Sequence, residues 1–482
     1  MNAALVFYGE FIVRTTKKFL ALALCAAISA NLFAAELSIT EDQKSEAAKE
    51  KSGQNGGQSQ ETGFVLQLQN ALNSGSMDAA LALFDNMPES LKGNGELQKL
   101  RASLLISAGR HADAQKIIAE LEQKNSGDLE IKEMKMVLAK ASGNVAAKSA
   151  AIKEIIALDP TNPSANVELG QEKVLRKKYK EARGFYMTAL KGDQNNQDAL
   201  FGYGQTSYYM NKIDDARKAF DKILRLDPNS AVAYAYIGKL YAEDENYKLA
   251  EENIVKAIEL NPGAYDYYMD WGTYSRMRGK FKQAEEAWSK AIKIDPSYFL
   301  AYAYRAGLFD EQNMYAKALD DYRMVIKTNP KYFYAYEALG ILAWHEEKYE
   351  EARASFEKAF SYYPQSVSYP LMIAACMYKS NRAFEVKPFL QKVMKTYSDR
   401  ESLEYLMIRL YHDLGPGNAE NLILQKIDKE DNSTKKGKMT FYMALYDEIK
   451  GHEETAKKIY NEVAALQSPM FFEFRLAEWK VK

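Results

Sequence analysis

Residues 264–297 read AYDYYMDWGTYSRMRGKFKQAEEAWSKAIKIDPS and decide the fold of this chain. Trp271 and Gly272 lie in a first apolar run, and a second run begins just after Gly279 and ends at Pro296. Glycine permits the tight turn between the two runs, and proline stops the second because it has no amide donor and restricts the residue before it. The stretch therefore predicts two helices joined by a short turn.

The same pattern recurs every 34 residues along the chain. Small residues recur in the first helix at Gly170, Gly204, Gly238, Gly272, Ala306 and Gly340. Alanine recurs in the second helix at Ala80, Ala114, Ala182, Ala216, Ala250, Ala284, Ala318 and Ala352. Large apolar residues recur at Tyr186, Phe220, Ile254, Trp288, Tyr322 and Phe356, and proline recurs at Pro160, Pro228, Pro262, Pro296, Pro330 and Pro364. Small residues let two antiparallel helices approach closely, and the large residues fill the space between successive helix pairs.

A 34-residue period with a small residue in the first helix, alanine and a large residue in the second and a closing proline resembles the tetratricopeptide repeat family. The resemblance covers roughly residues 61–470 and is strongest over 163–366. It implies an all-α fold, a right-handed superhelical solenoid of about twelve helix-turn-helix units with a C-terminal capping helix. Such an array can exceed the size of a single compact core because each unit contacts mainly its neighbours.

The changes in composition and repeat quality divide the chain into six segments. We expect a signal peptide (1–35), a flexible polar tether (36–63), degenerate N-terminal repeats (64–162), a core array (163–366), degenerate C-terminal repeats (367–470) and a capping helix (471–482).

The N-terminal segment predicts export. Arg14, Lys17 and Lys18 precede the apolar run FLALALCAAISANLFAA, and polar residues follow from Glu36. This order of charged, apolar and small residues is typical of a cleaved signal peptide. Cys25 leaves two readings open: LALC resembles a bacterial lipoprotein box, although Leu24 stands where that motif has a small residue, or the cysteine is an ordinary part of the apolar run.

The composition excludes several function classes. The 64 basic and 65 acidic residues are interspersed, so the chain lacks the basic field that nucleic-acid binding requires. The four histidines do not pair with cysteine or carboxylate residues at a metal-ligand spacing, and no catalytic or phosphate-binding motif occurs. We therefore expect no enzyme activity, no metal and no cofactor. The second cysteine, Cys376, lies on an apolar helix face and predicts a buried, inert thiol.

The resemblance implies that first-helix positions line a concave groove that binds a peptide or helix of another protein. These positions hold Phe201, Gln205, Tyr208, Tyr209, Lys239, Glu243, Met269, Thr273, Arg276, Glu337, Trp344 and His345. For Tyr208 and Trp344 the sequence leaves groove and core packing equally open. The column of Tyr234, Tyr268, Tyr302 and Tyr336 favours packing against neighbouring helices.

The resulting hypothesis is a non-enzymatic protein-interaction scaffold of a bacterial cell envelope. Its expected location is the periplasm or the outer membrane, with the cell surface or secretion as further options, and its only membrane contact is through a signal or lipid anchor. Two alternatives to this hypothesis remain open. In the first, the chain is a lipid-anchored structural component of an envelope assembly. In the second, it is an accessory that positions an enzyme acting on the cell wall.

Overall fold

The structure is a computed structural model, and it describes residues 55–415, 419–467 and 471–482. The expected signal peptide, Cys25 and the first part of the tether lie outside these residues. The end of the tether is helical, because α3 begins at Asn55, inside the stretch that the sequence predicts to be flexible up to residue 63. None of the described helices is both long enough and apolar enough to span a membrane.

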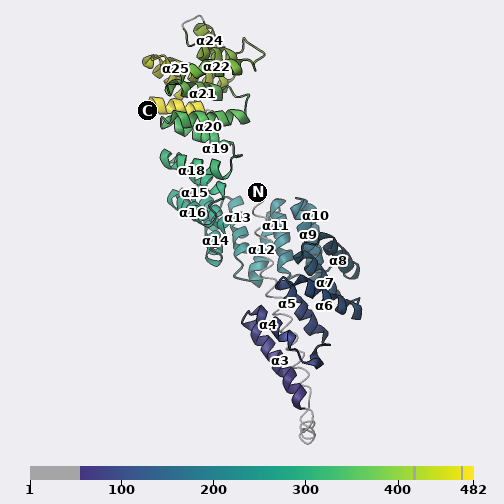
Figure 1. Ribbon diagram of the computed structural model, residues 1–482. Coiled ribbons are helices and arrows are strands. Elements are labelled where there is room, and N and C mark those ends of the chain that lie inside the picture. The colour runs from purple at the N-terminus through teal and green to yellow at the C-terminus, as the bar shows by residue number, and fades with distance from the viewer. Residues whose placement is uncertain (1–54, 416–418, 468–470) are drawn as a thin grey trace. The chain divides into compact units, whose positions relative to one another are not determined.

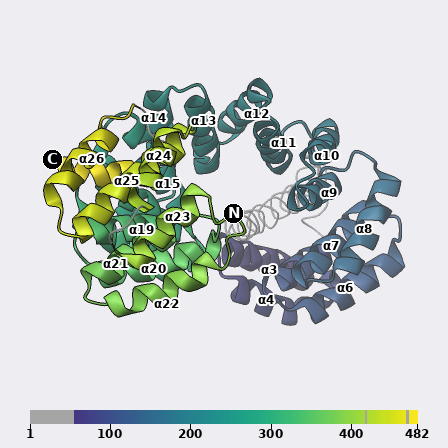
Figure 2. The same cartoon turned by 90° about the horizontal axis from the view of Figure 1, so that it is seen from above.

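The described chain is all-α and divides into two compact units between Leu226 and Asp227. The helices of the first unit are α3 (Asn55–Asn73), α4 (Met77–Asp85), a 3-10 turn η1 (Glu89–Leu91), α5 (Gly95–Ser107), α6 (His111–Lys124), α7 (Leu129–Ala141), α8 (Val145–Leu158), α9 (Pro163–Leu175), α10 (Tyr179–Gly192), α11 (Gln197–Tyr209) and α12 (Ile213–Leu226). They follow one another in a curved row, with α7, α9 and α11 on its inner side and α6, α8, α10 and α12 on its outer side (Figure 2).

The second unit continues the same pairing. Its helices are α13 (Ala231–Glu243), α14 (Tyr247–Leu260), α15 (Tyr265–Met277), α16 (Phe281–Ile294), α17 (Phe299–Glu311), α18 (Tyr315–Thr328), α19 (Tyr334–His345), α20 (Tyr349–Tyr362), α21 (Ser368–Lys379), α22 (Ala383–Met394), α23 (Leu403–Asp413), α24 (Ala419–Asp428), α25 (Ser433–Ile449), α26 (Glu453–Ala464) and α27 (Phe472–Val481). Odd-numbered helices up to α25 are the first helices of their pairs. The all-α, paired-helix prediction is confirmed, and the divisions at 162/163 and 366/367 stay predictions.

The small and large columns of the repeat meet inside each helix pair. A Cβ atom added to Gly170 would lie 2.7 Å from the Tyr186 ring, and one added to Gly340 would lie 2.8 Å from the Phe356 ring. Both distances are shorter than a van der Waals contact, so at these two positions a side chain would force the large ring of the second helix to move. The 34-residue spacing of these two columns thus records one recurring contact.

The turn inside each pair also repeats, and here the structure adds what the sequence analysis missed. The turn residue has a positive φ at Gly75, Gly109, Gly143, Lys177, Asn211, Glu245, Gly279, Asn313, Glu347 and Asn381, which lie 34 residues apart. Glycine and asparagine tolerate this left-handed conformation, whereas a longer side chain makes it less favourable. The register therefore holds from the first pair to the tenth, although the residues of this column differ in chemistry.

The C-terminal repeats form a closed core instead of a row with an open inner side. Ser368 to Met377 of α21 and Phe441 to Tyr446 of α25 are buried without interruption, and α21 contacts both α23 and α25. A helix that is buried all round lies inside a core. The yellow C-terminal helix α27 lies beside α20 and α21 (Figure 1) and contacts α19, α25 and α26.

Candidate functional site: the first-helix face

The twelve predicted groove residues fall into two groups that belong to different compact units. Phe201, Gln205, Tyr208 and Tyr209 belong to α11 of the first unit, and the other eight belong to α13, α15 and α19 of the second. Each group is therefore considered by itself.

In the first unit, the aromatic residues of α11 contact one another and their neighbours. Tyr209 is the most exposed, at 49%, and its ring lies 4.9 Å from Tyr179 and 5.8 Å from Tyr208 between centroids. Phe201 packs edge-on against Phe220 at 6.3 Å. These residues therefore form a partly exposed aromatic cluster on α11, a helix of the inner side of the row.

Two predicted groove residues are buried, and the prediction is corrected for them. Met269 is 7% exposed and Trp344 is 5% exposed. Met269 packs in the same core cluster as Trp288, whose Nε1 donates a hydrogen bond to the Met269 carbonyl oxygen at 3.3 Å. The Trp344 ring meets Tyr349 edge to face at 5.1 Å. A partner cannot reach these side chains without disturbing the core, so we assign both to packing.

Tyrosines of the 34-residue column pack as the sequence favoured. Tyr268, Tyr302 and Tyr336 are each less than 10% exposed, whereas Tyr234 is partly exposed. Their burial leaves the neighbouring positions of the same first helices as the accessible ones.

Part of the accessible surface of α13, α15 and α17 is what we call the open first-helix face. It consists of Lys239, Asp270, Thr273, Arg276, Tyr304, Gly307 and Glu311. Asp270, Thr273 and Arg276 follow one another at a spacing of three along α15, so they share one side of that helix. Asp270 recurs 34 residues later as Tyr304, and Thr273 recurs as Gly307, which places both columns on successive first helices.

Ion pairs tie the first helices together across this face. Lys239 Nζ of α13 lies 3.0 Å from Asp270 Oδ2 of α15. Arg276 donates from Nε and Nη2 to Glu311 Oε2 of α17, at 3.0 and 2.9 Å. Asp270 raises the pKa of Lys239 well above its usual range, and burial raises the pKa of the nearby Asp266 carboxyl. The face thus carries fixed charges of both signs in alternation.

Gly307 leaves the middle of α17 uncovered. Apart from the backbone of α17 itself and the two residues adjacent to Gly307, no atom of the described residues lies within 4 Å of the position that a Cβ on Gly307 would take, whereas a Cβ on Gly340 of the next first helix would clash with Phe356. Packing within the unit therefore explains Gly340 but does not explain Gly307. The uncovered backbone lies between Tyr304, which is 45% exposed, and the exposed Glu311 on the same helix.

At α19 the chain itself covers the predicted groove. The His345 ring stacks on Trp479 of α27 with 4.0 Å between centroids, and Glu337 accepts a hydrogen bond from Tyr369 Oη at 2.6 Å. Burial lowers the pKa of His345. The open face therefore runs along α13, α15 and α17 and meets α27 at its C-terminal end.

Sequence reasoning missed Asp270, Tyr304 and Asp310. The 34-residue columns contain the signal for one of them, since Asp310 follows the predicted Arg276 by one repeat. The resemblance does not lead to these residues, because the family's groove positions do not include every exposed position of this array.

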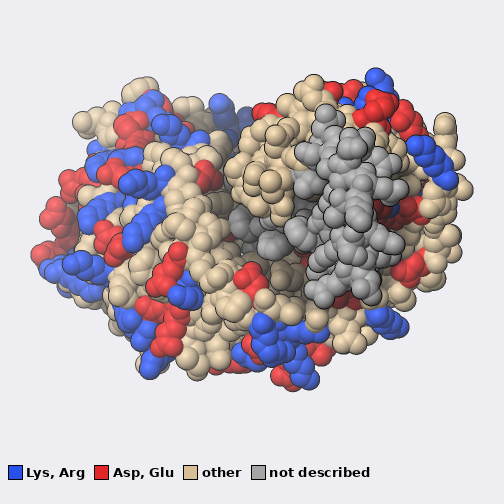
Figure 3. All heavy atoms as spheres, turned by 90° about the horizontal axis from the view of Figure 1, so that it is seen from below, with Lys and Arg blue, Asp and Glu red and all other residues tan. Residues whose placement is uncertain are grey.

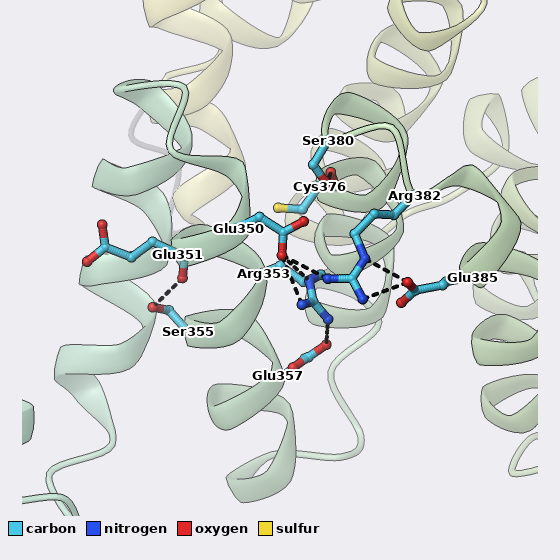
Figure 4. Close-up of polar contacts among 9 residues, drawn as sticks. All are labelled: Glu350, Glu351, Arg353, Ser355, Glu357, Cys376, Ser380, Arg382 and Glu385. Atoms are coloured by element: carbon cyan, nitrogen blue, oxygen red, sulfur yellow. Dashed lines mark hydrogen bonds and ion pairs between the residues drawn. The ribbon is translucent and has the colours of Figure 1, made fainter.

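The other chemistry-bearing groups of the second unit serve packing and local ion pairs. The Cys376 side chain is fully buried, and burial raises the pKa of its thiol. Figure 4 shows the charged network beside it: Arg353 bridges Glu350 and Glu357 at 2.9 and 2.7 Å, and Arg382 reaches Glu350 at 3.0 Å. Among the described residues, no group of three or more His, Cys, Asp or Glu side chains could hold a metal ion.

Comparison with protein families identifies the repeat. Models described as tetratricopeptide repeat match residues 173–240, 231–263, 269–333 and 308–367. No curated protein sequence matches the chain.

Solved structures resemble parts of the chain. The PilF structure of Pseudomonas aeruginosa is 21% identical, with 44% of this chain and 96% of that one covered and a TM-score of 0.39. MamA of Desulfovibrio magneticus RS-1 is 19% identical over 35% of this chain and 96% of that one, with a TM-score of 0.32. YrrB, described as a TPR protein with an unusual peptide-binding site, is 20% identical over 39% of this chain and 97% of that one, with a TM-score of 0.33.

Proposed function

We propose that the chain is a tetratricopeptide repeat protein that serves as a protein-interaction scaffold, and that it binds a peptide or helix of a partner protein on the open first-helix face. The chain contributes no chemistry to its partner in this proposal. It holds the partner on helices α13, α15 and α17.

The observation that carries the proposal is the uncovered backbone at Gly307. A glycine inside a helix costs about 1 kcal/mol relative to alanine, and no other helix among the described residues fills the space above this one. A partner chain can therefore approach the α17 backbone closely, with the half-exposed Tyr304 ring beside it. Exposed aromatic side chains next to a recess are the usual anchors of protein interfaces.

The charges of the face favour a partner that is itself a protein. Lys239 and Asp270 pair at one end, and Arg276 and Glu311 pair at the other. Acidic and basic side chains are also intermingled on the surface that Figure 3 shows. Alternating charges select a complementary pattern of side chains, whereas a nucleic acid requires a surface of one sign.

A photo-cross-linking residue at Tyr304 tests the proposal in intact cells. We expect cross-links to a defined segment of one partner, identified by mass spectrometry, and a synthetic peptide of that segment should bind the purified chain. The same cross-linker at Lys293, which is exposed on the second helix α16, is the matched control. Equal capture at both positions, or capture only at Lys293, would contradict binding on the first-helix face.

The proposed location is the cell envelope, after export. The order of charged, apolar and small residues over 14–35 supports it. The intact mass of the mature protein tests this part: a lipid-modified mass that begins at Cys25 would favour the anchored assembly component, and an unmodified mass that begins near residue 31 or 35 would favour a soluble scaffold. A mass that retains Met1 would contradict export by a cleaved signal.

A further inference from the structure

Helix α27 packs against other helices on two of its sides. One side is buried against the last repeat: Glu473, Leu476 and Ala477 are at most 2% exposed, and Tyr442 Oη of α25 donates a hydrogen bond to Glu473 Oε1 at 2.8 Å. The other side carries Phe472 and Arg475 one turn apart, with Trp479 following one turn further. This second side faces repeats that lie far upstream in the sequence.

The second side makes polar and aromatic contacts with α17 to α21. Arg475 Nη1 donates to Asp310 Oδ2 at 2.8 Å, and its guanidinium lies 4.3 Å from the Trp479 ring centroid. Trp479 Nε1 donates to Tyr315 Oη at 3.0 Å, and its ring stacks on His345. A guanidinium held between a carboxylate and aromatic rings is a specific arrangement, because it combines an ion pair with a cation–π contact.

Phe472 extends the contact to α20 and α21. Its ring lies nearly parallel to Tyr369, at 6.4 Å between centroids, and at 6.1 Å from Phe356. Phe472 therefore contacts α20 and α21, Arg475 contacts α17, and Trp479 contacts α18 and α19, so the three side chains together bridge the first helices α17, α19 and α21. They contact these helices as a bound amphipathic helix would, with anchors spaced by about one turn.

The surface that α27 covers continues the open first-helix face. Asp310 follows Arg276 by one 34-residue repeat, and His345 follows Glu311 by one repeat. Arg276 pairs with Glu311, so the next pair of the same columns, Asp310 and His345, is the one that α27 covers. The helix thus lies at the end of the surface to which the proposed function assigns the partner.

The contacts that dock α27 on the repeats have features that would let the helix detach and rebind. On the upstream side, the Arg475 side chain is 32% exposed and Asp310 is 18% exposed, so solvent already reaches the ion pair. On the buried side, Glu473 Oε2 has no well-aligned hydrogen-bond donor among the described residues. A buried carboxylate oxygen without a donor makes the docked state less favourable.

We infer that α27 is an internal occupant of the stretch of first helices α17, α19 and α21 that continues the open first-helix face, and that a partner helix with the same arrangement of a phenylalanine, an arginine three residues later and a tryptophan four residues after that displaces it there. The inference rests on the proposed function, since it names the class of partner for the continuation of the same surface. An internal occupant lowers the apparent affinity for the partner, because the partner can bind only during the fraction of time in which the site is uncovered. Weakening α27 should therefore strengthen binding in trans.

The test uses the full chain and a fluorescent peptide of residues 471–482 as the probe. We expect the chain with Arg475→Ala and Trp479→Ala to bind this peptide about tenfold or more tightly than the wild type, because its own α27 competes less. Adding Asp310→Asn should remove most of the gain, and a peptide with Arg475→Ala should bind neither chain. Circular dichroism and gel filtration report whether the variants keep their fold.

Hydrogen exchange of the wild-type chain gives a second measurement that needs no variant. Excess peptide should speed exchange of the α27 amides and leave the α25 amides unchanged, and unchanged exchange at α27 would overturn the inference. Equal peptide binding by the wild type and a folded double variant would also overturn it and make α27 a fixed cap. The proposed function would survive either result, since cross-linking at Tyr304 tests it separately.

Discussion

Trp479 of the last helix stacks on His345 of α19, with 4.0 Å between the ring centroids. His345 is one of the residues that the repeat pattern assigns to the groove, and Trp479 belongs to the helix that the sequence assigns to the cap. Their contact joins the two features: the capping helix lies on the groove positions of α19.

Acidification should loosen α27 through His345. Burial lowers its pKa below 6.5, and Arg475 and Lys480 of α27 add positive charge around it, while Glu346 opposes them. Because the folded pKa is depressed, the undocked state binds the proton more readily, and docking is lost as the pH falls through 6.5 toward the folded value. The protection factors of the α27 amides, which correct exchange for its intrinsic pH dependence, should therefore fall between pH 7.5 and pH 5.5 in the wild type.

His345→Gln is the control for this prediction, since glutamine does not titrate in that range. The acid-induced loss of protection should be smaller in the variant than in the wild type. An equal pH dependence in the two proteins would contradict the role of His345.

Glu473→Gln should change the pH dependence in the opposite direction. Burial raises the pKa of Glu473 above 4.5, so the folded state binds the proton more tightly than the unfolded state. The resulting stability is present at low pH and is lost as the pH rises through the folded pKa. Relative to the glutamine variant, the wild type should therefore lose stability between pH 5 and pH 8. Urea unfolding at both pH values measures the difference, and a constant difference would contradict the prediction.

Gly272→Ala should destabilise the second unit by about 1–3 kcal/mol through overpacking. A Cβ at this position would lie inside van der Waals contact of the Trp288 indole. Gly307→Ala is the matched control, because it lies in an equivalent helix with open space around it. The control should stabilise by up to about 1 kcal/mol through helix propensity. Thermal unfolding distinguishes the two, and equal effects would show that the close Gly272–Trp288 contact is not limiting.

Glu347→Gly should stabilise the second unit by about 0.5–1 kcal/mol. Glu347 adopts a φ of 56° in the turn between α19 and α20, a conformation that costs a side-chain-bearing residue about 1–2 kcal/mol, and the freedom of glycine in the unfolded chain offsets part of the gain. Lys348, the next residue, has a φ of -84°, so Lys348→Gly should destabilise. Chemical unfolding of the two variants checks the opposite signs.

The sequence predicts the helix pairs well because each column reports a local contact. Gly340 and Phe356 touch within one pair, and their spacing repeats wherever the contact repeats. The turn column was harder to see, since Lys177, Glu245 and Glu347 take the glycine conformation without being glycine. Backbone geometry that tolerates several residue types leaves a weak trace in a single sequence.

The groove was predicted less well because a first helix is packed on more than one side. Trp344 and Met269 stand at groove positions of the repeat, yet the structure buries both. Contacts between distant segments leave no period in the sequence, so the pairing of Arg475 with Asp310 could not be predicted from spacing. The open first-helix face is defined by which side chains the fold leaves exposed, and the spacing of residues in the sequence does not contain that information.

The central claim is tested most directly by measuring how tightly the Gly307→Trp chain binds the partner peptide. That peptide is the segment that cross-linking at Tyr304 identifies. The indole would fill the space above α17 that the described residues leave open. We expect affinity to fall by about tenfold or more while helicity and unfolding remain close to wild type, and Lys293→Trp on the second helix α16 should bind like the wild type. Unchanged affinity in a folded Gly307→Trp chain would contradict the claim that the partner lies on the open first-helix face.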